Sequence, residues 1–292
     1  MNFAAPAGAV DGRGGTTPHQ RKDLLLYAAV VLGVSTLTVA SFPLLHVTNN
    51  WAANALMFIP GLAALLFRLR RREGFQSVGW RTGSLLYWFW GIVLPIIVMA
   101  ISLPVSIRLG YAALAAPSTP IGGLVSHPVK ILENMLIYTL ISIPFAFGEE
   151  FGWRGYAQGK LVREFGLVPG LLLLGLMWGF WHTPIYYFTG TYPEHKLLGP
   201  FVMTPIDNIL AVVPMAWLYI RSRNIWVPTF THAFADILWG FSSLIFPPTQ
   251  EIKSWAVLQT MQLIVSIVLL MDLRSRTFQA SAKSSFLTEA SS

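Results

Sequence analysis

The stretch Phe147-Gly148-Glu149-Glu150-Phe151-Gly152-Trp153-Arg154 closes a mostly apolar run that begins at Ile131. Charged side chains are costly in hydrocarbon, so acidic residues in such a run are rare and usually functional. In a helix, Glu150 and Arg154 lie four residues apart on one face, where they can pair. Glu149 lies about 100° further round the helix, without a charged partner nearby. The spacing predicts one paired carboxylate and one, Glu149, that faces a pocket as a general base. The alternative is an ordinary helix end with a salt bridge.

The composition is that of an integral membrane protein. Hydrophobic residues make up 54% of the chain and charged residues 11%, whereas a soluble protein carries about 25% charged residues. The absence of cysteine excludes disulfides, zinc–thiolate sites and cysteine nucleophiles. The net charge of +7 comes from basic residues near the ends of apolar segments, as the positive-inside rule expects. We therefore expect the lipid bilayer, and not nucleic acid, as a partner.

Eight apolar segments follow one another along the chain. Each has close to the ~20 residues that are needed to cross a bilayer. They lie at about 24–45, 51–68, 84–107, 131–154, 167–188, 201–220, 225–246 and 254–272. The predicted fold class is an all-α, polytopic membrane helix bundle with about eight transmembrane helices.

The distribution of positive charge predicts the orientation and the domain limits. With the N-terminus inside, 16 of the 20 Lys and Arg residues fall on the inner side, so both termini are expected in the cytoplasm. A single transmembrane domain is predicted over 23–276, with flexible tails at 1–22 and 277–292. The first apolar segment exceeds the ~7–15 residues of a signal-peptide core, which favours a retained helix over a signal peptide.

Two further polar clusters interrupt later apolar segments. Trp178 and His182 are four residues apart, so the indole can lie against the imidazole. His232 and Asp236 have the same spacing, so Asp236 can accept a hydrogen bond from one ring nitrogen and leave the other aimed at a reacting group. The alternatives are a core histidine among aromatic residues and an interhelical hydrogen bond that only stabilises the bundle.

Glu149, His182, His232 and Asp236 together are the groups that water activation needs. Glu149 could take a proton from water, and the histidines could stabilise an oxyanion or hold a metal. One Glu and two His match the ligand types of a catalytic zinc site, although the chain has no His-Glu-x-x-His motif. Two cofactor predictions follow: none, or a zinc-like divalent metal held by Glu149, His182 and His232.

The order of these motifs resembles the CPBP family of intramembrane proteases. That family groups type II CAAX prenyl endopeptidases with bacteriocin-processing and self-immunity proteins. The resemblance covers about 131–245, the motif-bearing catalytic core, and rests on Glu149-Glu150-x-x-x-Arg154, His182 and His232-x-x-x-Asp236. It implies that Glu149 activates the attacking water, with His182 beside it. It further implies that Glu150 and Arg154 support their helix, and that His232 and Asp236 stabilise the oxyanion.

Two residues depart from the family pattern. Trp178 stands where the family often has Phe, and Asp236 stands where it often has Asn. Because an ionised Asp only accepts hydrogen bonds, Asp236 is either protonated or acts by orienting His232. His182 lies ~15 residues into its segment, about 22 Å from its start at ~1.5 Å per residue. Either that helix begins late, or the helix of Glu149 extends past Arg154.

The predicted function is hydrolysis of a peptide bond in a membrane-associated or lipidated peptide or protein. The resemblance implies a site that opens toward the cytoplasm, and the inner membrane of a bacterial cell is the expected location. The alternatives are a non-catalytic immunity or scaffold protein and a transporter that uses the same acids as a proton relay. The substrate and the oligomeric state are left open.

Overall fold

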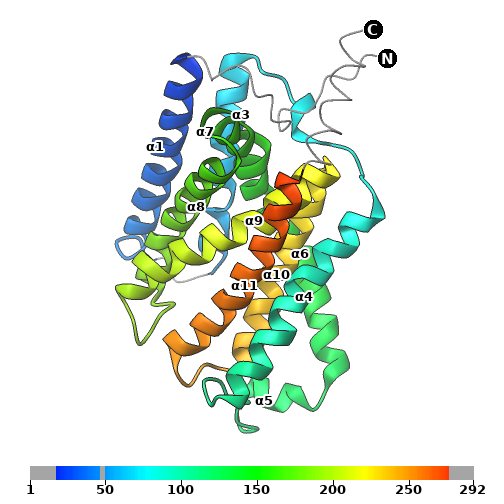
Figure 1. The fold of residues 1–292 in the computed structure, drawn as a ribbon. Coiled ribbons are helices and arrows are strands. Elements are labelled where there is room, and N and C mark those ends of the chain that lie inside the picture. The colour runs from blue at the N-terminus through cyan, green and yellow to red at the C-terminus, as the bar shows by residue number, and fades with distance from the viewer. Residues whose placement is uncertain (1–17, 47–49, 276–292) are drawn as a thin grey trace.

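The computed structural model describes residues 18–46 and 50–275, and within them it is helical apart from connections and two isolated bridges. The longer helices are α1 (Pro18–Ser41), α3 (Phe58–Arg71), α4 (Leu85–Arg108), α6 (Pro128–Gly152), α8 (Leu167–Thr189), α9 (Thr204–Ser222), α10 (Trp226–Ile245) and α11 (Glu251–Arg274). The shorter ones are α2 (Asn50–Ala55), η1 (Gln76–Val78), α5 (Pro120–Val125), η2 (Trp153–Gln158), α7 (Gly159–Phe165) and η3 (Gly199–Met203). Figure 1 shows the long helices packed side by side and alternating in direction, which confirms the predicted all-α bundle.

Seven segments of the described chain are long and apolar enough to cross a membrane. They are Arg21–Ser41, Ala52–Arg71, Leu85–Arg108, Pro128–Phe165, Leu167–Thr189, Gly199–Ser222 and Glu251–Arg274. The eighth predicted segment, 225–246, forms the helix α10 but is not among them. Its Thr, His and Asp residues lower its hydropathy, and it packs against α4, α6 and α9.

The boundaries differ from the predicted ones at two places. Helix α1 begins at Pro18, so residues 18–22 belong to a helix and not to a tail. Helix α6 passes directly into η2 and then α7, so the helix of Glu149 extends past Arg154 to Phe165. Residues 1–17 and the predicted C-terminal tail 277–292 lie outside the described part of the chain. The start of α1 and the end of α11 point toward the same end of the bundle (Figure 1), whereas the side of the membrane on which they lie stays a prediction.

A short segment before α4 fixes the start of α10, the helix that carries His232. Trp80 forms an isolated antiparallel bridge with Asn224. The Asn224 side chain donates to the Thr82 carbonyl at 2.6 Å and accepts from the Trp226 amide at 2.8 Å. That second bond satisfies a backbone donor in the first turn of α10, as an N-cap side chain does.

Glycines allow α6 and its neighbour α3 to approach closely beside the Glu149–Glu150 pair. A Cβ atom on Gly148 would lie 2.7 Å from the Met57 carbonyl oxygen and 2.9 Å from the Phe58 Cα. A Cβ on Gly152 would lie 2.5 Å from the carbonyl carbon of Pro60. Small residues at such crossings let backbones meet within a membrane bundle, and here they fix the position of α6.

We expect Gly148→Ala to destabilise the protein by about 1–3 kcal/mol, because the added methyl group overpacks the α3–α6 contact. Thermal unfolding of the purified protein in detergent measures this loss. Gly33→Ala on α1 is the matched control, because a Cβ at Gly33 would meet no atom within 4 Å. Equal unfolding temperatures for the two variants would contradict the proposed role of the close approach.

Candidate active site

Glu150 and Arg154 form a buried ion pair on α6 and η2. The Glu150 Oε1 atom accepts a hydrogen bond from Arg154 Nη1 at 2.9 Å, and both side chains are fully buried. This confirms the pairing that the four-residue spacing predicted. The Arg154 guanidinium also lies over the Trp178 ring, 4.4 Å from its centroid, a cation–π contact between η2 and α8.

The two oxygens of the Glu149 carboxylate differ in their hydrogen bonding to the described residues. Its Oε2 accepts from the indole N–H groups of Trp153 at 3.0 Å and of Trp178 at 2.6 Å. Its Oε1 is buried without a hydrogen-bond partner among the described residues. Glu149 therefore does have a local partner, Trp153, four residues on, because a tryptophan can donate to a carboxylate as an uncharged residue. The free Oε1 is the one atom of this carboxylate that remains available to accept a proton.

The π-helical segment η2 begins three residues after Glu150, at the end of α6. Such wide turns within helices are frequent at functional sites. The backbone here is braced by Arg68 of α3, which is 3% exposed and donates to the carbonyls of Gly155, in η2, and of Gly74. Arg68 thereby ties the helix of the two glutamates to the neighbouring helix.

His182 lies on α8, one turn after Trp178. Its Nδ1 is 3.0 Å from the Trp178 carbonyl oxygen. Because a carbonyl only accepts, Nδ1 carries the hydrogen in this contact, and Nε2 of the neutral ring has a free lone pair. The ring stacks on Tyr186, with centroids 5.3 Å apart, and meets Trp181 edge to face. Tyr186 is a component of the site that the sequence prediction missed.

His232 lies between two carboxylates. Its Nδ1 is 2.9 Å from Glu150 Oε1, and its Nε2 is 3.4 Å from Asp236 Oδ2. The predicted contact with Asp236 is confirmed in position, but the expectation that the other ring nitrogen would stay free is wrong. The reason is a tertiary contact, since Glu150 reaches across from α6 to α10.

The histidines share a cavity of about 560 Å³. His182, His232 and Asp236 line it, and so do Trp178 and Tyr186. Glu149 is not among the lining side chains; its partner Trp178 is. The Trp178 indole also lies 5.4 Å, centroid to centroid, from the His232 ring. Trp178 therefore joins the buried glutamate to the two histidines of the cavity.

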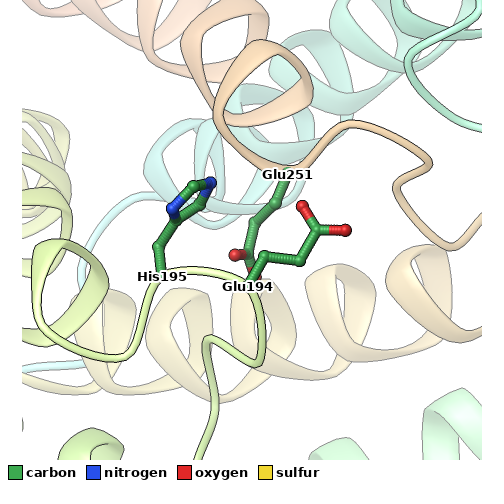
Figure 2. A group of neighbouring side chains, drawn as sticks. All are labelled: Glu194, His195 and Glu251. Carbon is green, nitrogen blue, oxygen red and sulfur yellow. The ribbon is translucent and has the colours of Figure 1, made fainter.

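One trio of His and Glu side chains in the described part of the chain has ligand atoms that all lie within 4.8 Å of one another. It consists of Glu194, His195 and Glu251, not of the predicted Glu149, His182 and His232. Figure 2 shows Glu194 and His195 on one loop, facing the first turn of α11, from which Glu251 extends. In the predicted set, both nitrogens of His232 contact carboxylates. As they are placed, those three residues do not fit a shared metal.

The helical bundle has a cavity lined by His182, His232 and Asp236, and the buried Glu149–Glu150 pair contacts two of the lining residues. This arrangement defines a class of polytopic membrane proteins with an enzyme-like polar site. Sequence comparison narrows the class. The profile of the type II CAAX prenyl endopeptidase Rce1-like family matches residues 131–238. The CAAX prenyl protease 2 of Methanococcus maripaludis is 28% identical over 80 residues, which are 26% of this chain and 29% of that relative. Both matches fall on the motif-bearing segment, and they bear out its resemblance to the CPBP family of intramembrane proteases.

Proposed function

We propose that the protein is an intramembrane endopeptidase that hydrolyses a peptide bond of a membrane-associated or lipidated peptide or protein. The observation that carries the proposal is the Glu149 carboxylate: two indoles fix one oxygen, and the other is buried without a hydrogen-bond partner in the part of the chain that the structure describes. A general base needs this combination of a fixed position and an available acceptor.

In the proposed reaction, Glu149 Oε1 takes a proton from water while the hydroxide oxygen adds to the substrate carbonyl carbon. The C–N bond then breaks, and the proton held by Glu149 passes to the departing amine, which leaves a carboxylic acid and an amine as products and returns Glu149 to its carboxylate form. Trp178 lines the cavity and donates to Glu149 Oε2, so in this scheme the water approaches Oε1 from the cavity beside the Trp178 indole, which stays in place. His182, through Nε2, accepts a hydrogen bond from that water and orients it.

His232 supplies the stabilisation of the oxyanion in this scheme. Flanked by Glu150 and Asp236, it can carry a hydrogen on both nitrogens. The Nε2 contact with Asp236 is long at 3.4 Å, so this N–H can turn to the developing oxyanion. Asp236 then acts by orienting His232 and needs no N–H of its own.

The substrate would reach the cavity from the cytoplasmic side of a bacterial inner membrane. The excess of Lys and Arg in the segments assigned to the inside supports this orientation. Comparative peptidomics of membranes that contain the wild-type protein or Glu149→Gln tests the proposed activity. We expect peptides that appear with the wild type alone, and identical peptide populations would contradict the proposal.

No step of the proposed reaction passes through a metal, so we expect peptide cleavage to survive metal removal. The measurement is the cleavage rate of the purified protein before and after treatment with 1,10-phenanthroline. Its non-chelating isomer 1,7-phenanthroline is the matched control. A loss of activity with the chelator alone, reversed by added zinc, would contradict glutamate catalysis without metal.

A further inference from the structure

The cavity that holds the histidines has a strongly acidic wall. Among its described lining residues are three carboxylates, Asp207, Asp236 and Glu251, and neither a lysine nor an arginine; of its two histidines, His232 contacts Asp236. A cleft with one sign of charge and low-dielectric walls concentrates ligands of the opposite sign. The reaction proposed above uses only Asp236, so the other two carboxylates need a separate explanation.

Asp207, on α9, is held by neutral donors alone. Its Oδ1 accepts from the Trp255 indole N–H at 2.5 Å, and its Oδ2 accepts from the Tyr192 hydroxyl at 3.2 Å. No Lys, Arg or His within the described residues forms an ion pair with it, although Arg154 and Arg221 each have an acidic partner. A carboxylate taken out of water without a counter-ion is costly, so a cation supplied by a ligand would complete this site.

Gln259 gives an independent indication of a donor-bearing ligand. It lies on α11 one turn after Trp255, so the two share a helix face. Gln259 is 7% exposed and lines the same cavity, yet its Oε1 has no hydrogen-bond partner in the described part of the chain. The Oε2 of Glu251 is likewise without a partner there. Unused acceptors on one wall match an ammonium or guanidinium group, which only donates.

A continuous row of side chains connects this acidic wall with the histidines. The His182 ring stacks on Tyr186, and Tyr186 meets Tyr192 edge to face with centroids 6.2 Å apart. Tyr192 in turn donates to Asp207. A substrate segment whose scissile bond lies at His182 can therefore extend along the same cavity toward Asp207.

We propose that the cavity selects a peptide segment with a lysine or arginine side chain, which Asp207 and Gln259 receive, and that it disfavours acidic segments. That this peptide is cleaved as a substrate rests on the proposed protease function, whereas the charge preference in binding does not depend on catalysis.

The test measures binding of fluorescent peptides to full-length protein in lipid nanodiscs, with Glu149→Gln as the background so that nothing is cleaved. The probes are hydrophobic decapeptides with blocked ends, identical except for one central Lys, Gln or Glu. We expect the Lys peptide to bind about tenfold or more tightly than the Gln peptide, the size of effect that a hydrogen bond to a charged group provides. The Glu peptide should bind most weakly.

Adding Asp207→Asn should reduce the Lys-over-Gln preference to less than about threefold, since asparagine keeps an acceptor for Trp255 but loses the charge. Glu133→Gln is the matched control, because Glu133 is an exposed acid of α6 outside the cavity lining, and it should keep the preference. Equal binding of the three peptides, or a preference that survives Asp207→Asn, would overturn the inference. Wild-type cleavage of the same peptides reports separately on the proposed function.

Discussion

Replacing Glu149 with glutamine is expected to lower the rate of peptide cleavage by about 10²- to 10⁴-fold, the usual contribution of a general acid–base group. Glutamine cannot take a proton from water. It keeps a carbonyl oxygen, so it can still accept the two indole hydrogen bonds that hold Glu149. We therefore expect the variant to insert and to accumulate in the membrane like the wild type. The measurement is the cleavage rate of purified protein in proteoliposomes.

Glu133→Gln removes an exposed carboxylate from the same helix and should leave the rate unchanged. Full activity of purified Glu149→Gln would refute the general-base assignment. Inactivity combined with loss of folded protein would assign Glu149 to structure, and thermal unfolding of both variants separates the two cases.

The second large effect is expected at Arg154. Replacing Arg154 with methionine leaves Glu150 as a fully buried charge without its guanidinium partner, which should destabilise the fold by about 3–5 kcal/mol. Trp178 also loses the cation–π contact with the guanidinium. Thermal unfolding in detergent, followed by tryptophan fluorescence, measures the loss.

The double variant Glu150→Leu, Arg154→Met removes both charges and should recover much of that stability, because apolar replacement of a buried pair is often neutral or favourable. It should remain inactive, since His232 loses its partner Glu150. A single variant as stable as the wild type would show that the pair is not what stabilises this part of the bundle.

Local spacing explains which features could be predicted from the sequence. The length and apolarity of the segments predicted the helices, because a bilayer-spanning helix has to satisfy its backbone internally. The pair Glu150–Arg154 and the contact His232–Asp236 follow from a spacing of four residues. Helix α10 is not among the segments that are apolar enough to count as a membrane span, because its site residues, such as His232 and Asp236, lower its hydropathy.

Contacts between distant helices could not be predicted in this way. The bond between His232 and Glu150 joins residues 82 positions apart, and that between Trp178 and Glu149 joins residues 29 positions apart. Periodicity defines a face of one helix but not the helix that this face meets. For the same reason, the sequence did not predict that Asp207 belongs to the site, whereas in the structure it lines the same cavity as the histidines.

The most direct test of the central claim, that Glu149 delivers water to the peptide carbonyl, is a single-turnover cleavage in H₂¹⁸O with the protein in excess over peptide. If Glu149 acts as a general base, the new carboxylate of the product contains ¹⁸O after the first turnover, and Glu149, analysed by mass spectrometry of the digested protein, contains none. An unlabelled product, or ¹⁸O in the Glu149 side chain, would indicate a covalent acyl–glutamate intermediate and would contradict general-base catalysis by Glu149.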